Sequence, residues 1–454
     1  MISDSFTRNT LLLTGASLLM SGIDMGYHAF LARSLGAAGL GLHQLTLSVS
    51  GLCATLAISG IRFASTRLVA EELGAGRDSV QRAMGRCLAY AGFCGLCALL
   101  LLRLLAEPLG FLWIGDARAV LPLRIAALSM PCISLCAALS GYYTARGLVW
   151  KPVLAQLAEA LAGVGLSVLL LKRTPPGDLE MRCAALMLAR AAADLLSLLL
   201  LAAFFVCERQ RRPGTETGGR YSARLLRLAL PLAFSACTRS ALTTLRQLLI
   251  PRGLRASGLN AETALAGYGV IQGMVLPLLF FPACLPASAA ELVVPVLTKA
   301  QVRDDRETIK NTAGRLLRLS LQYSLAVSAI LFLCADLLGG LLFHSRDAAR
   351  FLRILAPLMP VTYVDLAADG CLKGLGEQLW SMGVNVAEAS LGLLLLLLLL
   401  PRRGLGAYVA VLYFCEGLNL ALSLLRLLPC LRASGGGVRR PCGGSAKCAY
   451  TAGR

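Results

Sequence analysis

The sequence is poor in charged and aromatic residues for its length. Of its 454 residues, 15% are charged and 6% are aromatic, whereas 57% are hydrophobic and the mean hydropathy is +0.69. A soluble domain usually carries about 25% charged residues, so this composition excludes a soluble globular fold. Apolar runs recur along the chain, and a membrane helix needs about 20 mostly apolar residues. The sequence therefore predicts an all-α polytopic membrane protein.

Motifs of enzymatic or metal chemistry are also missing. The sequence has no phosphate-binding glycine loop, nucleophile elbow or metal-binding helix motif, and His28, His43 and His344 are far apart in it. Most of its 16 cysteines lie in apolar runs, where Cys behaves as a small hydrophobic residue. The C-x-x-C of Cys94 and Cys97 has no second pair or nearby His. We expect no enzyme, no metal and no cofactor.

Acidic residues are scarce beside basic ones. The 44 Lys and Arg outnumber the 25 Asp and Glu, for a net charge of +19. In a membrane protein such an excess holds loops on the cytoplasmic side, so it does not indicate nucleic-acid binding. Most loop Lys and Arg lie in the even-numbered loops and the basic tail, although the loop at 172–182 is basic too. We expect a multi-pass protein of the cell membrane with both termini cytoplasmic.

Twelve apolar runs are bounded by charged residues or by Gly and Pro. Two of them, 42–70 and 263–297, exceed the bilayer thickness and should tilt, bend or project. The second of these also carries four prolines, which should kink it. The expected spans are 9–32, 42–70, 84–106, 119–144, 153–172, 183–207, 225–250, 263–297, 313–338, 351–373, 379–400 and 405–428.

The two halves of the chain repeat each other. LRIAALSMP at 123–131 and LRILAPLMP at 352–360 share six of nine residues, at an offset of 229. The same offset also matches Gly, Arg and Glu positions, namely Gly85-Arg86 with Gly314-Arg315, Gly141 with Gly370, Gly147 with Gly376, and Glu159 with Glu388. We expect two pseudo-symmetric six-helix lobes, 1–212 and 213–432, and a disordered basic tail, 433–454. Paired lobes around a cleft are typical of alternating-access transporters.

Local sequence resembles one transporter family. FLARSLGAAGLGLHQL (30–45), ISGIRFASTRLVAEELGAG (58–76) and GMVLPLLFFPACLPASAAELVVPVL (273–297) resemble the stage V sporulation protein B group. That group belongs to the multidrug/oligosaccharidyl-lipid/polysaccharide (MOP) flippases, which are MATE-like. Within these segments, Gly36, Gly39 and Gly41 permit a tight turn and close helix approach. Glu71 and Glu72 should end a helix in water.

The resemblance implies a flippase for a lipid-linked saccharide of the polyprenyl diphosphate type, used in peptidoglycan, spore-cortex or polysaccharide biosynthesis. Related lipid II flippases carry arginines in the middle of the first span, where Ser21 and Tyr27 stand here. The resemblance therefore favours the sporulation or polysaccharide branch. A cation-coupled multidrug antiporter and a non-transporting membrane partner of cell-wall enzymes are the alternatives.

Charges inside the spans mark candidate sites, because each costs about 2.5–3.5 kcal/mol on insertion scales. Arg239 and Arg246 are seven residues apart on one helix face with no acidic residue between 221 and 260. The resemblance implies that spans one, two, seven and eight line the cleft, where such arginines suit a diphosphate. Pairing with Asp24 or Glu291 is the competing interpretation. Those two carboxylates, with Asp365, are the candidate gate or coupling groups.

A third candidate cation, Arg62, stands 229 residues before Glu291. Opposite charges at matched positions of two lobes could form a gate that opens to expose Arg62 to an anionic headgroup. The alternative is that each side chain bonds within its own lobe.

Other charges suggest local structure. The i, i+4 spacings predict Arg190–Asp194 and Asp369–Lys373 pairs. Glu159 and Glu388 suggest a polar clamp inside each lobe.

Overall fold

Helices make up every regular element that the structure describes. It is a computed structural model, and it describes residues 2–74, 80–175, 177–208, 221–303 and 305–432. The elements of the first half are α1 (Ile2–Ile58), α2 (Ile61–Gly74), α3 (Val80–Pro108), η1 (Leu109–Ile114), η2 (Ala117–Ala119), α4 (Val120–Ala126), α5 (Ser129–Ala145), α6 (Trp150–Arg173) and α7 (Leu179–Cys207).

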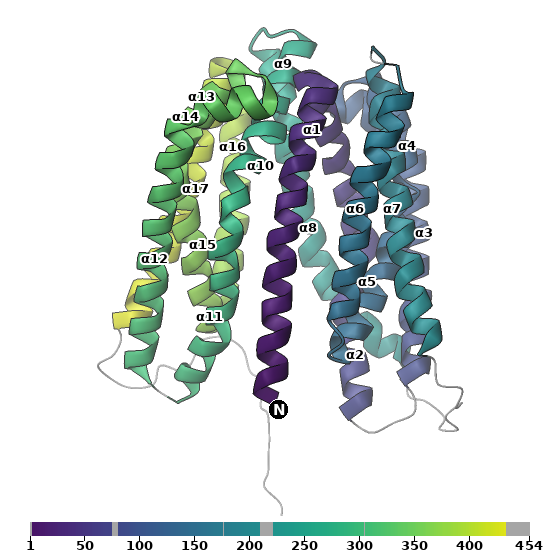
Figure 1. Ribbon diagram of the computed structural model, residues 1–454, viewed down its shortest axis with the longest axis vertical. Helices are drawn as coiled ribbons and strands as arrows, with labels where there is room; N and C mark the ends of the chain where they lie inside the picture. Colours follow the sequence, from purple (N-terminus) through teal and green to yellow (C-terminus); the bar gives the residue numbers. More distant parts are fainter. Residues whose placement is uncertain (1, 75–79, 176, 209–220, 304, 433–454) are drawn as a thin grey trace, which may run out of the picture.

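The second half mirrors this order. Its elements are α8 (Tyr221–Ala256), α9 (Ala261–Gly269), η3 (Val270–Val275), α10 (Leu276–Phe280), η4 (Phe281–Ala283), α11 (Cys284–Val302), α12 (Arg306–Leu333), α13 (Ala335–Leu338), η5 (Gly339–Phe343), α14 (Arg346–Leu355), η6 (Ala356–Leu358), α15 (Met359–Gly374), α16 (Gln378–Arg403) and α17 (Leu405–Arg432). Figure 1 shows the helices of the two halves side by side as two bundles, with the first part of α1 between the bundles.

The long helix α1 holds two membrane crossings. Within the described residues, ten helices are long and apolar enough to cross a membrane, or eleven with the bent pair that α4 and α5 form. One of them, Leu18–Leu73, has 56 residues, far more than the roughly 20 that a crossing needs. Gly36 divides it, with φ 69° and ψ 178°, a conformation that residues with a Cβ rarely adopt. The division yields the twelve predicted spans.

The predicted kinks are confirmed. The eighth span is broken into α9, α10 and α11 by the π-helix η3 and the 3₁₀-helix η4. Pro277 and Pro282 lie at these breaks, where a missing N–H interrupts the helical ladder. The second span breaks between α1 and α2, at Ser59 and Gly60, both with positive φ.

The internal repeat extends to backbone geometry. Gly147 and Gly376 have φ of 73° and 78°, and Gly115 and its match His344 have φ of 73° and 53°. The π-helices η1 and η5 occupy matching places just before that second pair.

The repeat also extends to ion pairs, which form between matched residues in the two halves. Arg124 bonds Glu107 at 2.5 Å, and 229 residues later Arg353 bonds Asp336 at 2.5 Å. Equivalent residues therefore perform equivalent structural roles in the two halves.

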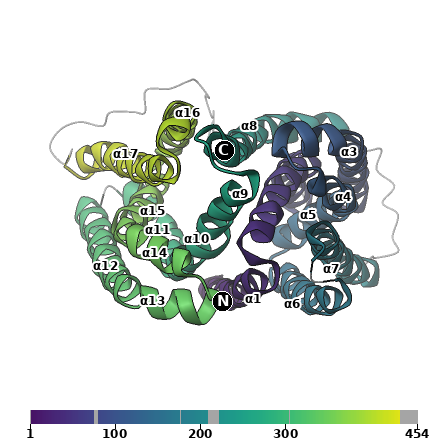
Figure 2. The ribbon, with the colours of Figure 1, turned by 90° about the horizontal axis from the view of Figure 1, so that it is seen from above.

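The helix α8 belongs to both bundles. Near its start, a Cβ at Gly60 would lie 2.5 Å from the Ala229 carbonyl oxygen, so α8 begins against the first bundle. Near its end, a Cβ at Gly253 would lie 2.4 Å from the Leu400 side chain of α16. Figure 2 shows α8 passing from the α3 side of the molecule to α16. The predicted boundary at 212/213 and the predicted tail, 433–454, lie outside the described residues.

Candidate functional site

A cavity of about 490 Å³ lies in the first bundle between α1, α6 and α7. Its polar lining includes Asp24, Tyr27, His28, His43, Gln156, Glu159, Ser167, Arg190 and Asp194. Asp24, a predicted coupling residue, is exposed at this lining. The Tyr27 and Ser167 hydroxyls form a hydrogen bond of 2.9 Å that ties α1 to α6.

The predicted Arg190–Asp194 pair does not form. Both side chains line the cavity, but no ion pair joins them in the part of the chain that the structure describes. Asp194 is only 4% exposed, and its Oδ2 has no hydrogen-bond partner. An i, i+4 spacing permits a pair on a helix surface. Here Arg190 is exposed while Asp194 is buried.

The reversal at Gly36 brings together two histidines that are distant in the sequence. His28 precedes the turn, His43 follows it, and both line the cavity. The Nδ1 atoms of both are buried without a hydrogen-bond partner. Sequence reasoning missed this pair because only the folding back of α1 makes them neighbours. A glycine between two long apolar runs was the available signal.

A second cavity of about 270 Å³ lies in the second bundle, between α15, α16 and α17. Its polar lining includes Thr362, Asp365, Asp369, Ser381, Asn385, Glu416, Asn419 and Ser423. Asp369 forms the predicted i, i+4 pair with Lys373, at 2.5 Å. Asp365 is 9% exposed, and its Oδ1 is buried without a partner. Among the predicted coupling residues, Asp365 thus has an oxygen free to accept a proton or cation.

Arg246 has a partner that the sequence reasoning did not consider. Its Nη1 lies 3.0 Å from Oε1 of Glu388 on α16. The alternative pairing with Asp24 or Glu291 is therefore wrong for Arg246, and the predicted clamp at Glu388 is made with α8. The repeat-matched Glu159 instead lines the first cavity.

The remaining predicted cations are exposed and have no ion-pair partner among the described residues. Arg62 lies in the first turn of α2, and Arg239 lies seven residues before Arg246 on α8; both are exposed. Thr55 and Ser240 hydroxyls, 3.3 Å apart, join α1 to α8 beside Arg239. Both arginines thus lie along the seam where α1 and α2 meet α8.

Arg62 and Glu291 keep matched surroundings but form no pair in this conformation of the described chain. A Cβ at Gly141 would meet the Arg62 carbonyl oxygen at 2.5 Å, and one at the matched Gly370 would meet Ala290. Glu291 is exposed on α11, as Arg62 is on α2. Both side chains are thus available to other groups.

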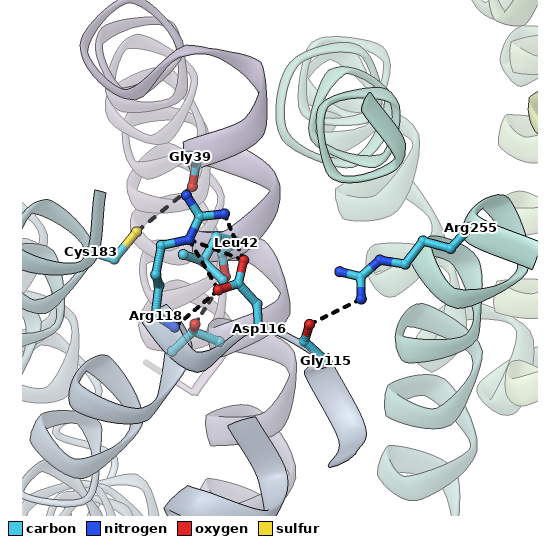
Figure 3. A network of polar contacts seen from close by, with 8 residues as sticks. Gly39, Leu42, Gly115, Asp116, Arg118, Cys183 and Arg255 are labelled. Atoms are coloured by element: carbon cyan, nitrogen blue, oxygen red, sulfur yellow. Dashed lines mark hydrogen bonds and ion pairs between the residues drawn. The ribbon is translucent and has the colours of Figure 1, made fainter. Parts of the chain in front are cut away.

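At the end of the molecule opposite the N-terminus, arginines cross between the bundles. Arg33 of α1 donates to the Leu342 carbonyl oxygen, at 2.9 Å, and to that of Leu341 in η5. Arg255 of α8 donates to the Gly115 carbonyl oxygen, at 3.0 Å, just after η1 (Figure 3). We call the hydrogen bonds of each of these two arginines an arginine clasp. Sequence patterns could not predict them, because backbone carbonyl acceptors carry no residue signature.

At the other end, α8 is held to α2 by charge. Arg224 Nη2 lies 2.7 Å from Glu71 Oε2, and its Nη1 lies 3.7 Å from Glu72 Oε1. Glu72 is 1% exposed. The expectation that both glutamates end α2 in water is therefore wrong for Glu72, which is buried beside Arg224 of α8.

Comparisons of the sequence with known proteins place it among membrane transport proteins. The model of the family described as polysaccharide biosynthesis protein matches residues 6–301, and the MatE model matches residues 231–398. Stage V sporulation protein B of Bacillus subtilis (strain 168) is 23% identical over 438 residues, covering 93% of this chain and 83% of that protein. Sporulation protein YkvU of the same organism is 21% identical over 376 residues, covering 82% and 83%.

Solved structures share the fold. A lipid II flippase in an inward closed conformation aligns with a TM-score of 0.72 at 11% identity, covering 92% of this chain and 87% of that one. An inward-facing multidrug resistance MATE family transporter of the MOP superfamily aligns with a TM-score of 0.67 at 15% identity, covering 92% and 95%. The predicted MATE-like fold is confirmed.

Proposed function

Because this chain belongs to the polysaccharide biosynthesis protein family, we propose that it carries the headgroup of a lipid-linked saccharide across the membrane by alternating access. The chain is a multi-pass membrane transporter of the MOP superfamily, and its relatives are not enzymes. The proposed cargo is a polyprenyl diphosphate saccharide of peptidoglycan or polysaccharide biosynthesis. The similarity to stage V sporulation protein B and to a lipid II flippase supports this class.

The observation that carries the proposal is the pair of unpartnered arginines on the α1/α2–α8 seam. Arg62 and Arg239 are exposed and have no ion-pair partner among the described residues. Gly60 contacts Ala229, ten residues before Arg239, which is about 15 Å along the helix. A diphosphate spans part of that distance, and charge-assisted hydrogen bonds from Arg are the strong contacts that it can accept. Arg246 lies on the same face of α8 as Arg239, and its ion pair with Glu388 holds its guanidinium in place.

The proposed coupling groups are carboxylates in the two bundle cavities. Asp365 offers a buried, unpartnered oxygen, with Glu416 in the same lining. Asp24 lines the other cavity with Glu159 and Asp194. Binding of a proton or cation in either cavity would change the electrostatic balance inside one lobe, which is the differential interaction that a two-state equilibrium requires.

These carboxylate-lined cavities also favour a second candidate function, a cation-coupled multidrug antiporter. The two functions make different demands on Arg62 and Arg239. An antiporter for cationic drugs needs the carboxylates and not the arginines, whereas a diphosphate carrier needs the arginines.

The test uses purified protein in liposomes that contain a fluorescent lipid-linked saccharide. Inversion is measured as the fraction of label that a membrane-impermeant quencher reaches, and a parallel arm measures efflux of a cationic dye. The proposal requires saccharide inversion that Arg62→Gln and Arg239→Gln reduce. Dye efflux that survives both changes, without saccharide inversion, would instead establish the antiporter.

The proposed Arg62–Glu291 gate has its own test in this assay. Arg62→Glu should impair inversion, because two acidic side chains then repel each other when the cleft narrows. Adding Glu291→Arg should restore part of it. Absence of rescue, with both proteins normally inserted, would count against the gate while leaving the transport function intact.

A further inference from the structure

A groove of about 910 Å³ lies outside both bundle cavities, between the first turns of α12 and the last turns of α17. It is lined by Lys310, Asn311, Gly314, Arg315, Leu317, Arg318, Leu319, Leu428 and Leu431. Figures 1 and 2 show α12 and α17 at the edge of the molecule farthest from the first bundle. The groove therefore opens to the surrounding membrane and not to the space between the lobes.

Three cations line this groove without an ion-pair partner in the described part of the chain. Lys310, Arg315 and Arg318 are exposed, and none of the lining residues is acidic. Gly314 stands among them on α12, and a Cβ there would meet nothing within 4 Å. The missing side chain leaves room between the cations for a group of the size of a phosphate.

Four leucines form the rest of the wall. Leu319 and Leu428 are exposed, while Leu317 and Leu431 are half-buried. Beneath them Ala313, Leu316 and Leu427 belong to an apolar cluster that α12 and α17 form with α15. The groove thus has leucines beside its three cations.

The position of the three cations along α12 places them at headgroup depth. The helix has 28 residues, which is about 42 Å at 1.5 Å per residue, and the hydrocarbon core is about 30 Å thick. An apolar run begins at Leu319, directly after the last of the three cations. The run continues through α13 to Leu338, and these 20 residues span about 30 Å at 1.5 Å per residue. The cations before Leu319 therefore lie among the lipid phosphates, and the apolar residues from Leu319 onward lie among the acyl chains.

We propose that this groove is a binding site for an anionic phospholipid of the surrounding membrane. The phosphate accepts hydrogen bonds from Lys310, Arg315 and Arg318, and the acyl chains lie on the leucines. Basic pockets between membrane helices at the cytoplasmic face bind anionic headgroups in this way, and each added cation strengthens attraction to an anionic surface. The occupant is a lipid and not a free anion because leucines of α12 and α17 line the same groove as the cations.

The experiment measures lipid binding to the purified full chain in detergent by native mass spectrometry. Phosphatidylglycerol and cardiolipin are titrated against phosphatidylcholine, which has no net charge. The expected result is preferential retention of the anionic lipids. Each Lys310→Gln, Arg315→Gln or Arg318→Gln change should weaken retention about fivefold, and the triple variant should lose the preference.

Two further variants separate the site from general charge and from misfolding. Gly314→Trp fills the groove and keeps all three cations, so it should also lose the preference. Arg86→Gln removes the cation at the matched position of Arg315 in the first bundle and should leave the preference unchanged. Size-exclusion profiles and thermal midpoints without added lipid verify that each variant folds.

Three results would overturn the proposal. The first is equal retention of phosphatidylcholine and phosphatidylglycerol by the unmodified chain. The second is undiminished anionic preference in folded triple and Gly314→Trp variants. The third is displacement of the lipid by millimolar inorganic pyrophosphate alone, which would mean that the leucines contribute nothing.

Discussion

Some charged side chains inside the helices have an ion-pair partner in the described chain, and others have none. Arg246 is satisfied by Glu388, and Asp369 by Lys373. Arg239 is exposed, and Asp365 keeps a buried, unpartnered oxygen. A charged group at membrane depth without a partner is costly. A role in transport is therefore the best explanation for the presence of Arg239 and Asp365.

Arg239→Gln should reduce saccharide inversion by roughly tenfold or more, since a hydrogen bond to a charged group is worth about 1.5–3 kcal/mol. Arg252→Gln is the matched control, because Arg252 is exposed on the same helix but points to a different face. The liposome inversion assay measures both. Equal activity in the two variants would remove Arg239 from the binding site.

Asp365→Asn should stabilise the fold while impairing transport. Neutralising a buried carboxylate with an unsatisfied oxygen relieves a penalty of about 1–3 kcal/mol, so the thermal midpoint should rise. Transport should lose its dependence on the coupling proton or cation, measured as inversion against external pH and sodium. Asp336→Asn, which affects an exposed carboxylate paired with Arg353, should leave that dependence unchanged.

At the scale of elements, the crossing of α1 and α9 joins the lobes through backbone contact. A Cβ at Gly41 would lie 2.3 Å from the Leu265 carbonyl oxygen, and one at Gly269 would lie 2.0 Å from that of Ala37. Glycine lets the two helices approach this closely. The resemblance in the 30–45 segment predicted a tight turn and close approach, and the structure confirms both.

Gly269→Leu should disrupt this crossing. Overpacking a tight interface costs about 1–3 kcal/mol, and here the clash is with backbone atoms that cannot rotate away. We expect a lower thermal midpoint and slower inversion. Gly406→Leu on α17 is the control, because a Cβ there meets nothing within 4 Å. A Gly269→Leu protein with unchanged midpoint and rate would show that the crossing is not tightly packed in the membrane.

At the scale of the whole molecule, the arginine clasps and the α1–α9 crossing close one end, while α8 bridges the bundles at the other. Each clasp connects one lobe to carbonyl groups at or next to the π-helix of the other: Arg33 to η5, and Arg255 to Gly115 after η1. The π-helices occupy repeat-matched places, so the two clasps follow the pseudo-symmetry of the fold. In the proposed alternating-access cycle both clasps would break together.

Arg33→Gln combined with Arg255→Gln should shift the protein toward the state in which this end is open. Loss of three charge-assisted hydrogen bonds removes about 4.5–9 kcal/mol of gross interaction, enough to shift a two-state equilibrium strongly. Hydrogen–deuterium exchange should become faster in η1 and η5 but stay unchanged in α16. Arg103→Gln, an exposed arginine on α3, is the control, and protection in the double variant equal to that control would refute a closing role for the clasps.

Hydropathy and the repeat determined the class, the twelve spans, the kinked eighth helix and the matched halves. Hydropathy adds up over the apolar residues of each segment, and the repeat compares residue identities at a fixed offset. Neither depends on which helices face each other. The Asp369–Lys373 pair was also predictable, because both residues lie on one helix at a fixed spacing.

Only the tertiary structure decided the partners between helices. Arg246 could be assigned to Glu388, and Glu72 to an interface with α8, only once the helices were placed. The same holds for the separation of Arg190 from Asp194 and for the cavity shared by the histidines on either side of Gly36. A side chain's partner depends on helix rotation and crossing, and a period of 3.6 residues fixes a face without fixing what that face meets.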